Sequence, residues 1–352
     1  MLRSYLEAII LDSLMRIKGE RTVYSVFHVL AGKKSSQTIQ DIHLYEIAKY
    51  FRTYPTMKRE DFQHIIAYFE EQGLIEVNHE KGEYRLAPKS RCVLDDFYRK
   101  NPVLTYLNGF KHHNTSMLFW KRFSLLFQVL SNVVHRNGTY YCIQRDLAIQ
   151  NWVKDFLFHH KSIKNMPALL HHELQELLST VPDQHAVVFL LKLSGYQRIG
   201  YSHKQIADQL RMNESDVYYT FLHVLHRMLQ QVEERPTSLL GLLGDDLRIG
   251  ASSQTNSSMV TYKYLKYNLT IDQIAEKRHL KRNTIEDHIV ELVINRVIND
   301  ISAYVSDELA GRIICIATEG NTRQLKAIKQ ALLNRVSYFQ IRLALAKGGS
   351  LD

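Results

Sequence analysis

Six residues near position 280 have side chains suited to DNA binding. They are Lys277, Arg278, Lys281, Arg282, Asn283 and Thr284. Lysine and arginine neutralise backbone phosphates, and the Asn283 amide could pair with an adenine edge, with helix capping as an alternative role. The carboxylates of Glu286 and Asp287 follow and would face the same phosphates. We therefore expect weak or structure-dependent DNA binding rather than sharp sequence readout.

A helix-turn-helix over residues 269–292 would position this cluster. Ile271 and Ile274 fall on one face of a first short helix, and Ala275 lets a second helix cross closely. Leu280 fills the corner of the turn. An i, i+4, i+7 apolar stripe marks the second helix, the one that this motif usually presents to a major groove. That stripe is Ile285, Ile289 and Leu292. An ordinary helical hairpin is the alternative.

The same spacing occurs a second time, within residues 200–221. Its apolar positions are Ala207, Met212, Val217 and Phe221. Together with Pro182 and the apolar helix at 187–193, this block resembles region four of sigma factors. The outward positions are expected to be Asn213, Glu214, Ser215, Asp216, Tyr218 and Tyr219. They include two acids and no base, so we predict a protein-contacting surface here, with Asn213, Glu214, Tyr218 and Tyr219 as partner-binding residues.

Residues 1–88 are predicted to form a winged-helix-like domain. Helices are expected near 6–14, 23–30, 44–51 and 58–72, a polar loop at 33–38, and strands at 74–77 and 84–86. Lys58 and Arg59 open the last helix and could contact nucleic acid. Winged helices also dock proteins, so both roles stay open.

The remaining segments are predicted from composition. Residues 89–235 form a helical domain that contains the sigma-like motif, 236–260 form a linker, and 261–346 form the C-terminal helix-turn-helix domain. The leucines in the first half of the linker favour docking on a neighbour, and its Ser/Thr/Asn-rich second half is expected to be mobile. The run 117–134 contains Lys121 and Arg122, which indicates a buried helix rather than a membrane span.

The overall composition fits a protein with a nucleic-acid partner. The formal net charge is +9, which is also compatible with a generic basic protein. Cys92, Cys142 and Cys315 are far apart, so free buried thiols are expected. The histidine pairs at 112–113, 159–160 and 171–172 are interpreted as surface or capping residues rather than metal ligands. No signal peptide is recognised, and a cytoplasmic, nucleoid-associated protein is expected.

Two strings resemble the helix-turn-helix domain found at the C-terminus of some RecQ-family helicases. They are Thr270–Leu292 and Leu325–Ala346. The whole chain resembles the YpbB-type proteins of Gram-positive bacteria, closely over 262–346 and more loosely before. The resemblance implies an accessory protein that acts with a RecQ-like helicase. It leaves open whether the C-terminal domain binds DNA or the helicase.

Motifs for catalysis are missing. The sequence has no GxxxxGK[ST] phosphate loop, no acidic cluster typical of a two-metal nuclease and no GxSxG elbow. We expect a mainly α, multi-domain protein without enzymatic activity, cofactor, metal or small-molecule substrate. Its expected function is that of a DNA-associated adaptor for a RecQ-like helicase, on duplex or forked DNA, in repair or replication restart. The alternatives are a transcription regulator and a protein-only scaffold.

Overall fold

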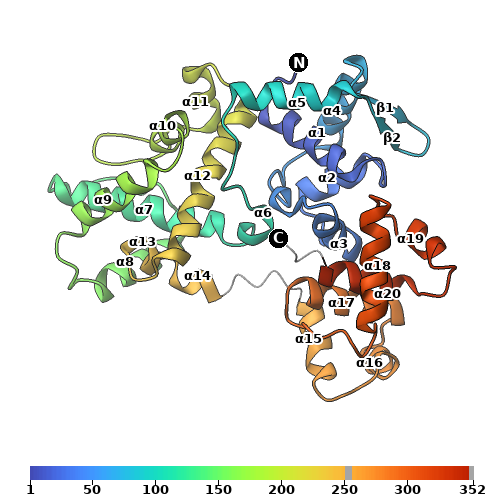
Figure 1. Ribbon diagram of the computed structural model, residues 1–352. Coiled ribbons are helices and arrows are strands. Elements are labelled where there is room, and N and C mark those ends of the chain that lie inside the picture. Colours follow the sequence, from blue (N-terminus) through green and yellow to red (C-terminus); the bar gives the residue numbers. More distant parts are fainter. Residues whose placement is uncertain (250–255, 349–352) are drawn as a thin grey trace. The chain divides into compact units, whose positions relative to one another are not determined.

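A computed structural model describes residues 1–249 and 256–348. In this part of the chain the structure is mainly helical, as predicted, and its strands form one hairpin (Figure 1). The described residues divide into two compact units, which are treated separately below: unit 1 contains 1–11 and 91–249, and unit 2 contains 12–90 and 256–348. Most of the predicted winged-helix-like segment therefore shares a unit with the C-terminal domain, a grouping that the sequence did not indicate.

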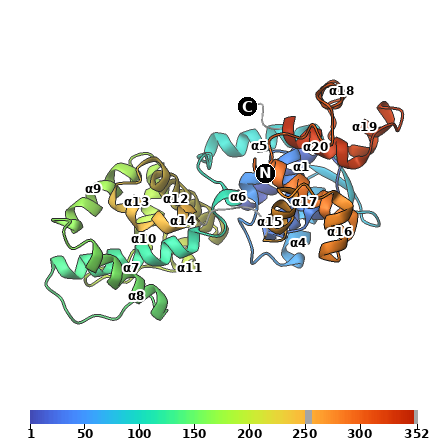
Figure 2. The ribbon, with the colours of Figure 1, turned by 90° about the horizontal axis from the view of Figure 1, so that it is seen from below.

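Unit 1 is an assembly of helices around one long central helix, α12 (Figure 2). Its elements are α6 (Gly109–His112), α7 (Ser116–Val134), α8 (Leu147–His159), α9 (Met166–Leu178), α10 (Asp183–Leu191), α11 (His203–Leu210), α12 (Glu214–Glu234), α13 (Leu239–Leu243) and α14 (Asp245–Ile249). Two further helices, α1 (Tyr5–Ile17) and α5 (Lys89–Lys100), carry the chain between the units. The predicted helix at 117–134 is confirmed as α7, and most of its residues are buried.

Aromatic rings form much of the core of unit 1. Phe119, Phe123 and Phe189 are completely buried, and Trp120 contacts Phe221 edge to face with ring centroids 4.8 Å apart. Such pairs contribute about 0.5–1.5 kcal/mol beyond their buried area. These rings therefore supply much of the packing of this unit.

Buried histidines line one side of α12. His185 Nδ1 lies 3.0 Å from His223 Nδ1, and the backbone N–H of Asn108 donates to His226 Nδ1. His112, predicted to lie at the surface, is 5 % exposed and contacts the His226 ring, because it lies on the short α6 packed against α12. Burial lowers the pKa of His112 and His185 to about 4 and that of His223 to about 3. Among the described residues no cluster suited to a metal ion occurs.

The predicted linker begins with ordered structure. Leu239, Leu240 and Leu243 are buried, which confirms that the leucines of its first half dock. The carboxylate of Glu173, itself 5 % exposed, accepts hydrogen bonds from the backbone N–H groups of Leu239 and Leu240 at 2.7 and 2.9 Å. A buried carboxylate thus provides hydrogen-bond acceptors for the first backbone N–H groups of α13. The expected mobility of the second half falls partly on residues 250–255, outside the described residues. For residues 256–260 the expectation is wrong, because they belong to α15 (Asn256–Leu265) and Ser258 is completely buried.

The N-terminal part of unit 2 consists of helices and a two-stranded hairpin. Its elements are α2 (Tyr24–Ala31), α3 (Ser36–Leu44), the short 3-10 helix η1 (Ala48–Tyr50), α4 (Arg59–Glu71), β1 (Ile75–Asn78) and β2 (Glu83–Leu86). The loop predicted at 33–38 ends at Ser35, whose side chain accepts from Thr38 N–H and starts α3. The helix predicted at 44–51 is wrong, because α3 ends at Leu44 and the 3-10 helix η1 follows. The predicted helix at 58–72 and the hairpin are confirmed within a residue at most boundaries.

The C-terminal part of unit 2 is a helical domain. Its helices are α15 (Asn256–Leu265), α16 (Ile271–Arg278), α17 (Arg282–Ile294), α18 (Asp307–Glu319), α19 (Leu325–Ala331) and α20 (Tyr338–Gly348). Ile274, Ile285, Ile289 and Ile341 are completely buried in its core. Helix α3 packs against α17 and α20, so the N-terminal segment completes the surroundings of this core.

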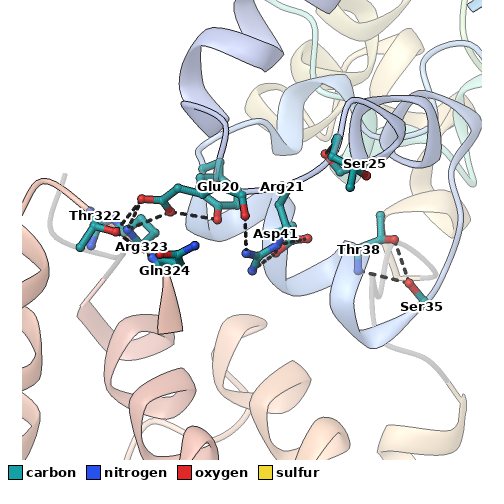
Figure 3. Close-up of polar contacts among 11 residues, drawn as sticks. Glu20, Arg21, Ser25, Ser35, Thr38, Asp41, Thr322, Arg323 and Gln324 are labelled. Atoms are coloured by element: carbon teal, nitrogen blue, oxygen red, sulfur yellow. Dashed lines mark hydrogen bonds and ion pairs between the residues drawn. The ribbon is translucent and has the colours of Figure 1, made fainter. Parts of the chain in front are cut away.

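Polar contacts also hold the two segments of unit 2 together (Figure 3). The carboxylate of Glu20 accepts from the Thr322 hydroxyl at 2.6 Å and from the Arg323 backbone N–H at 3.1 Å. Nearby, the Lys18 amine donates to the Asn321 side chain at 2.7 Å. The segments 12–90 and 256–348 are thus joined in one unit by packing and by hydrogen bonds.

The described helices include none that is long and apolar enough to cross a membrane. The three cysteines are free, as expected, but all are exposed, so the prediction that they are buried is wrong. Cys92 and Cys315 lie on outward faces of helices, and Cys142 lies in the segment between α7 and α8.

Candidate nucleic-acid interface

Helices α16 and α17 form the predicted helix-turn-helix. Thr270 caps α16 through a reciprocal pair of hydrogen bonds with Gln273. His279 ends the helix in the left-handed region, with φ of +51°, a conformation that costs a non-glycine residue about 1 kcal/mol. Leu280 packs against the domain core in the turn, as predicted.

The turn and the start of α17 present an open, polar surface. Lys277, Lys281 and Asn283 are exposed there, with Thr284 half-buried beside them. Lys281 is the N-cap residue of α17, and its side chain forms no capping hydrogen bond. The capping role considered for Asn283 is therefore wrong. Because the first backbone N–H groups of a helix have no partner within the helix, this end can receive an anionic oxygen.

Arg282 lies in the same surface but is already engaged. Its guanidinium donates to both carboxylate oxygens of Asp272 on α16 and to Glu286 one turn along α17, at 3.1 Å. The side chain remains about half exposed, at 53 %. A phosphate would have to compete with these two acids for the guanidinium.

Arg278 points into the domain. Its guanidinium donates to the Ser257 carbonyl at 2.8 Å, to the Ser257 hydroxyl at 2.9 Å and to the Thr261 hydroxyl. These acceptors lie on α15, where the same Thr261 hydroxyl is hydrogen-bonded to the buried His288 of α17. Arg278 therefore links α15 to the helix-turn-helix by hydrogen bonds. Its guanidinium does not belong to the open surface formed by the turn and the start of α17.

The acids on α17 are neutralised by the fold. Asp287, expected to face a groove, forms an ion pair with Arg342 of α20 at 2.6 Å, with only 27 % of its side chain exposed. Glu286 is paired with Arg282. Sequence reasoning missed Arg342 and Asp272 because ion pairs between separate helices leave no local pattern. The charge of the open surface is consequently dominated by Lys277 and Lys281.

Helices α11 and α12 form the second helix-turn-helix with the same local geometry. Ser202 and Gln205 form the capping box, and Arg211 ends α11 with φ of +54°. The following helix starts after Asn213, again without a side-chain cap. The repeat in the sequence thus corresponds to a repeated structure.

The start of α12 is covered by the chain's own N-terminus. The Asn213 amide donates to the Arg3 carbonyl at 2.7 Å, and Asp216 accepts from the Tyr5 backbone N–H at 2.6 Å. Tyr219, predicted to face outward, is completely buried, because α12 is packed on several sides. Asn213 and Glu214 are exposed and Tyr218 is half-buried, so these three predicted partner-binding residues remain accessible, although the Asn213 amide is bonded to Arg3.

Lys58 and Arg59 lie at the start of α4, well apart from α16 in Figure 1. Both are exposed, and the Arg59 guanidinium lies over the Tyr24 ring, 4.5 Å from its centroid. Glu60 and Asp61 follow immediately in the first turn. The structure therefore does not bring this pair into the surface formed by Lys277 and Lys281.

Comparison with known proteins agrees with this geometry. Residues 257–345 match the family model of a helix-turn-helix domain. The chain is 34 % identical over 344 residues to Protein YpbB of Bacillus subtilis (strain 168), which covers 98 % of this chain and 97 % of that protein. No solved structure matches the chain. The helix-turn-helix domain suggests DNA binding.

Proposed function

The chain belongs to the YpbB family, and on this premise we propose that it is a non-enzymatic, nucleoid-associated adaptor that holds DNA for a RecQ-like helicase in repair or replication restart. Two features support the proposal. The helix-turn-helix domain leaves one polar, lysine-bearing face open. The strings Thr270–Leu292 and Leu325–Ala346 resemble the C-terminal domain of RecQ-family helicases.

The observation that carries the DNA-binding part is a pair of exposed lysines at the turn, neither of which has an ion-pair partner among the described residues. Lys277 and Lys281 are exposed beside the uncapped start of α17, the end of the second helix that contacts DNA in this motif. Asn283 and Thr284 supply hydrogen-bonding groups in the first turn. Because Asp287 and Glu286 are engaged with arginines, they oppose phosphate binding less than free carboxylates would.

The helicase-binding part is assigned to unit 1. Its own helix-turn-helix carries no base at the start of α12, and the N-terminal residues Arg3 and Tyr5 occupy that face. Glu214 and Tyr218 remain accessible at its edge. An acidic, aromatic edge suits a protein surface rather than a phosphate backbone.

The test of DNA binding is the double variant Lys277→Glu/Lys281→Glu in the full chain. We expect at least about tenfold weaker binding to a labelled forked duplex, with a salt dependence about two ions less steep, because two phosphate contacts are lost. Fluorescence anisotropy at several salt concentrations measures both. Lys33→Glu/Lys34→Glu is the matched control, since it changes the net charge equally at exposed positions of the same unit. Equal affinity and salt slope for both variants and the native chain would refute the assignment.

The test of the helicase partner is affinity capture from native cell extract with point variants. Deleting the C-terminal domain is unsuitable, because α3 packs on α17 and α20 and would lose its cover. We expect the native chain and Lys277→Glu/Lys281→Glu to recover a RecQ-like helicase, and Glu214→Lys/Tyr218→Ala to recover much less. Recovery of RNA polymerase and no helicase would support the transcription regulator instead.

A further inference from the structure

The segment between α7 and α9 of unit 1 exposes aromatic rings and basic side chains to solvent. We propose that the surface formed by residues 135–164 binds single-stranded nucleic acid. It belongs to a different unit from the lysine pair of α16 and α17, so the proposal does not depend on the helix-turn-helix. It extends the proposed function from holding a duplex to holding a separated strand.

The first observation is the fixed presentation of Tyr141. This side chain is 97 % exposed, yet its backbone is held by Gln128 of α7, which is 5 % exposed. Gln128 Nε2 donates to the Tyr141 carbonyl, and Gln128 Oε1 accepts from Ile143 N–H, both at 3.0 Å. A buried amide therefore holds the backbone immediately after a solvent-exposed ring. A ring on such a backbone can stack with little loss of conformational entropy.

The second observation is the open face of α8. Ile149, Val153 and Phe156 are buried on one side of this helix. Phe158 is 66 % exposed, and the Lys161 amine lies 5.0 Å from the centroid of its ring. The helix thus presents an aromatic ring already accompanied by a cation, the combination that recurs in proteins that bind single strands.

The third observation is charge. Residues 135–164 contain five basic side chains and two acidic ones, which gives a net charge of +3. The basic residues are Arg136, Arg145, Lys154, Lys161 and Lys164, and all are exposed. Within the chain that the structure describes, none of the five has an ion-pair partner. One of the two acids, Asp146, is used to cap α8 by accepting from Ala148 N–H.

These features select single strands over other anionic partners. Unpaired bases offer both faces to an exposed ring, whereas the bases of a duplex are stacked on one another. The cations can follow the phosphates of the same strand. An acidic protein segment would satisfy the charges, but it would not need isolated rings held on rigid backbone.

The experiment uses the full chain and labelled oligothymidine of about 20 nucleotides, with an oligouridine of equal length to distinguish DNA from RNA. The native chain is expected to bind at least one of them. Tyr141→Ala and Phe158→Ala are each expected to weaken binding about tenfold. Lys154→Glu/Lys161→Glu should weaken binding and flatten its salt dependence. Thermal unfolding and circular dichroism verify that each variant is folded.

Two controls separate this surface from others. Tyr201→Ala removes a tyrosine of unit 1 that is 41 % exposed outside the segment and should leave binding unchanged. Lys277→Glu/Lys281→Glu should weaken binding to the forked duplex while leaving oligothymidine binding within about twofold. The proposal is overturned if neither oligonucleotide binds, or if folded Tyr141→Ala/Phe158→Ala binds as tightly as the native chain.

Discussion

The two helix-turn-helix motifs share their backbone and differ in what covers the second helix. Both begin with a capping box, end the first helix with a left-handed residue and leave the next helix without a side-chain cap. In the motif of unit 1, Asp216 binds the N-terminal segment. Thr284 occupies the equivalent position in unit 2, beside an open surface. The motif alone therefore specifies a shape, and the side chains in the first turn of the second helix decide whether that shape binds the chain itself or something else.

The second helices also differ in how they are buried. α12 runs from Glu214 to Glu234 and packs against helices on several sides, including rings from α7 and α10. α17 is shorter, from Arg282 to Ile294, and contacts α3, α15, α16 and α20 while its first turn stays exposed. Most of α12 is buried in the core of unit 1 and leaves only its beginning accessible, whereas α17 exposes its basic first turn to solvent.

Acidification is expected to produce the largest difference in stability between the two motifs. The pKa of His223 on α12 is lowered to about 3, and the pKa of His185 beside it to about 4, by burial. Because the unfolded chain binds these protons near pH 6.5, their stabilising contribution is complete above that pH and is lost as pH falls towards 4. At pH 5 each such histidine lowers the free energy of unfolding by about 2 kcal/mol.

Hydrogen exchange at pH 7 and pH 5 measures this effect locally. Peptides from α12 should lose protection before peptides from α17, because more histidines with a pKa lowered by burial surround α12 in the described residues. Around α12 these are His112, His185, His223 and His226. Around α17 they are His288 and His43, which lies on the adjoining α3. Equal loss of protection in the two helices would show that the histidines around α12 do not control its acid stability.

Alanine substitutions at the equivalent positions Asp216 and Thr284 should have different effects on stability. Asp216→Ala removes the acceptor for the Tyr5 N–H and should cost about 2 kcal/mol of unfolding free energy, since a hydrogen bond to a charged group is lost. Thr284→Ala removes a partly exposed hydroxyl and should cost at most about 0.5 kcal/mol. Urea unfolding measures both, and faster proteolysis within residues 1–11 should accompany only the first. Similar costs would mean that the N-terminus is not held by α12.

A small effect is also expected from Arg282→Ala. Its pairs with Asp272 and Glu286 lie at the surface, where ion pairs contribute about 0–1 kcal/mol. Because the guanidinium is engaged, its loss should weaken binding to forked DNA much less than Lys277→Glu/Lys281→Glu does. Anisotropy titrations compare the two variants directly. A loss as large as that of the lysine variant would place Arg282 in the DNA interface.

Local signals accounted for both helix-turn-helix motifs and for part of the candidate site. The spacing of Ile274, Leu280, Ile285 and Ile289 predicted both helices and the turn, because a 3.6-residue period and a buried corner residue are properties of a short segment. The basic residues near 280 were also visible. The roles of these basic residues could not be predicted from local signals. Arg278, for example, is hydrogen-bonded to Ser257 on another helix, a contact that forms only in the folded domain.

The sequence by itself determined a mainly helical protein with two helix-turn-helix motifs, since periodicity and capping act over a few residues. The tertiary structure decided which face of each motif is open. The hydrogen bond from the Tyr5 N–H to Asp216 joins residues 211 positions apart in the sequence, and the hydrogen bond from the Thr322 hydroxyl to Glu20 joins residues 302 positions apart. Contacts at such separations depend on how whole helices pack, and no local pattern encodes them. This packing places the N-terminal residues against α12 and leaves Lys277 and Lys281 exposed at the start of α17.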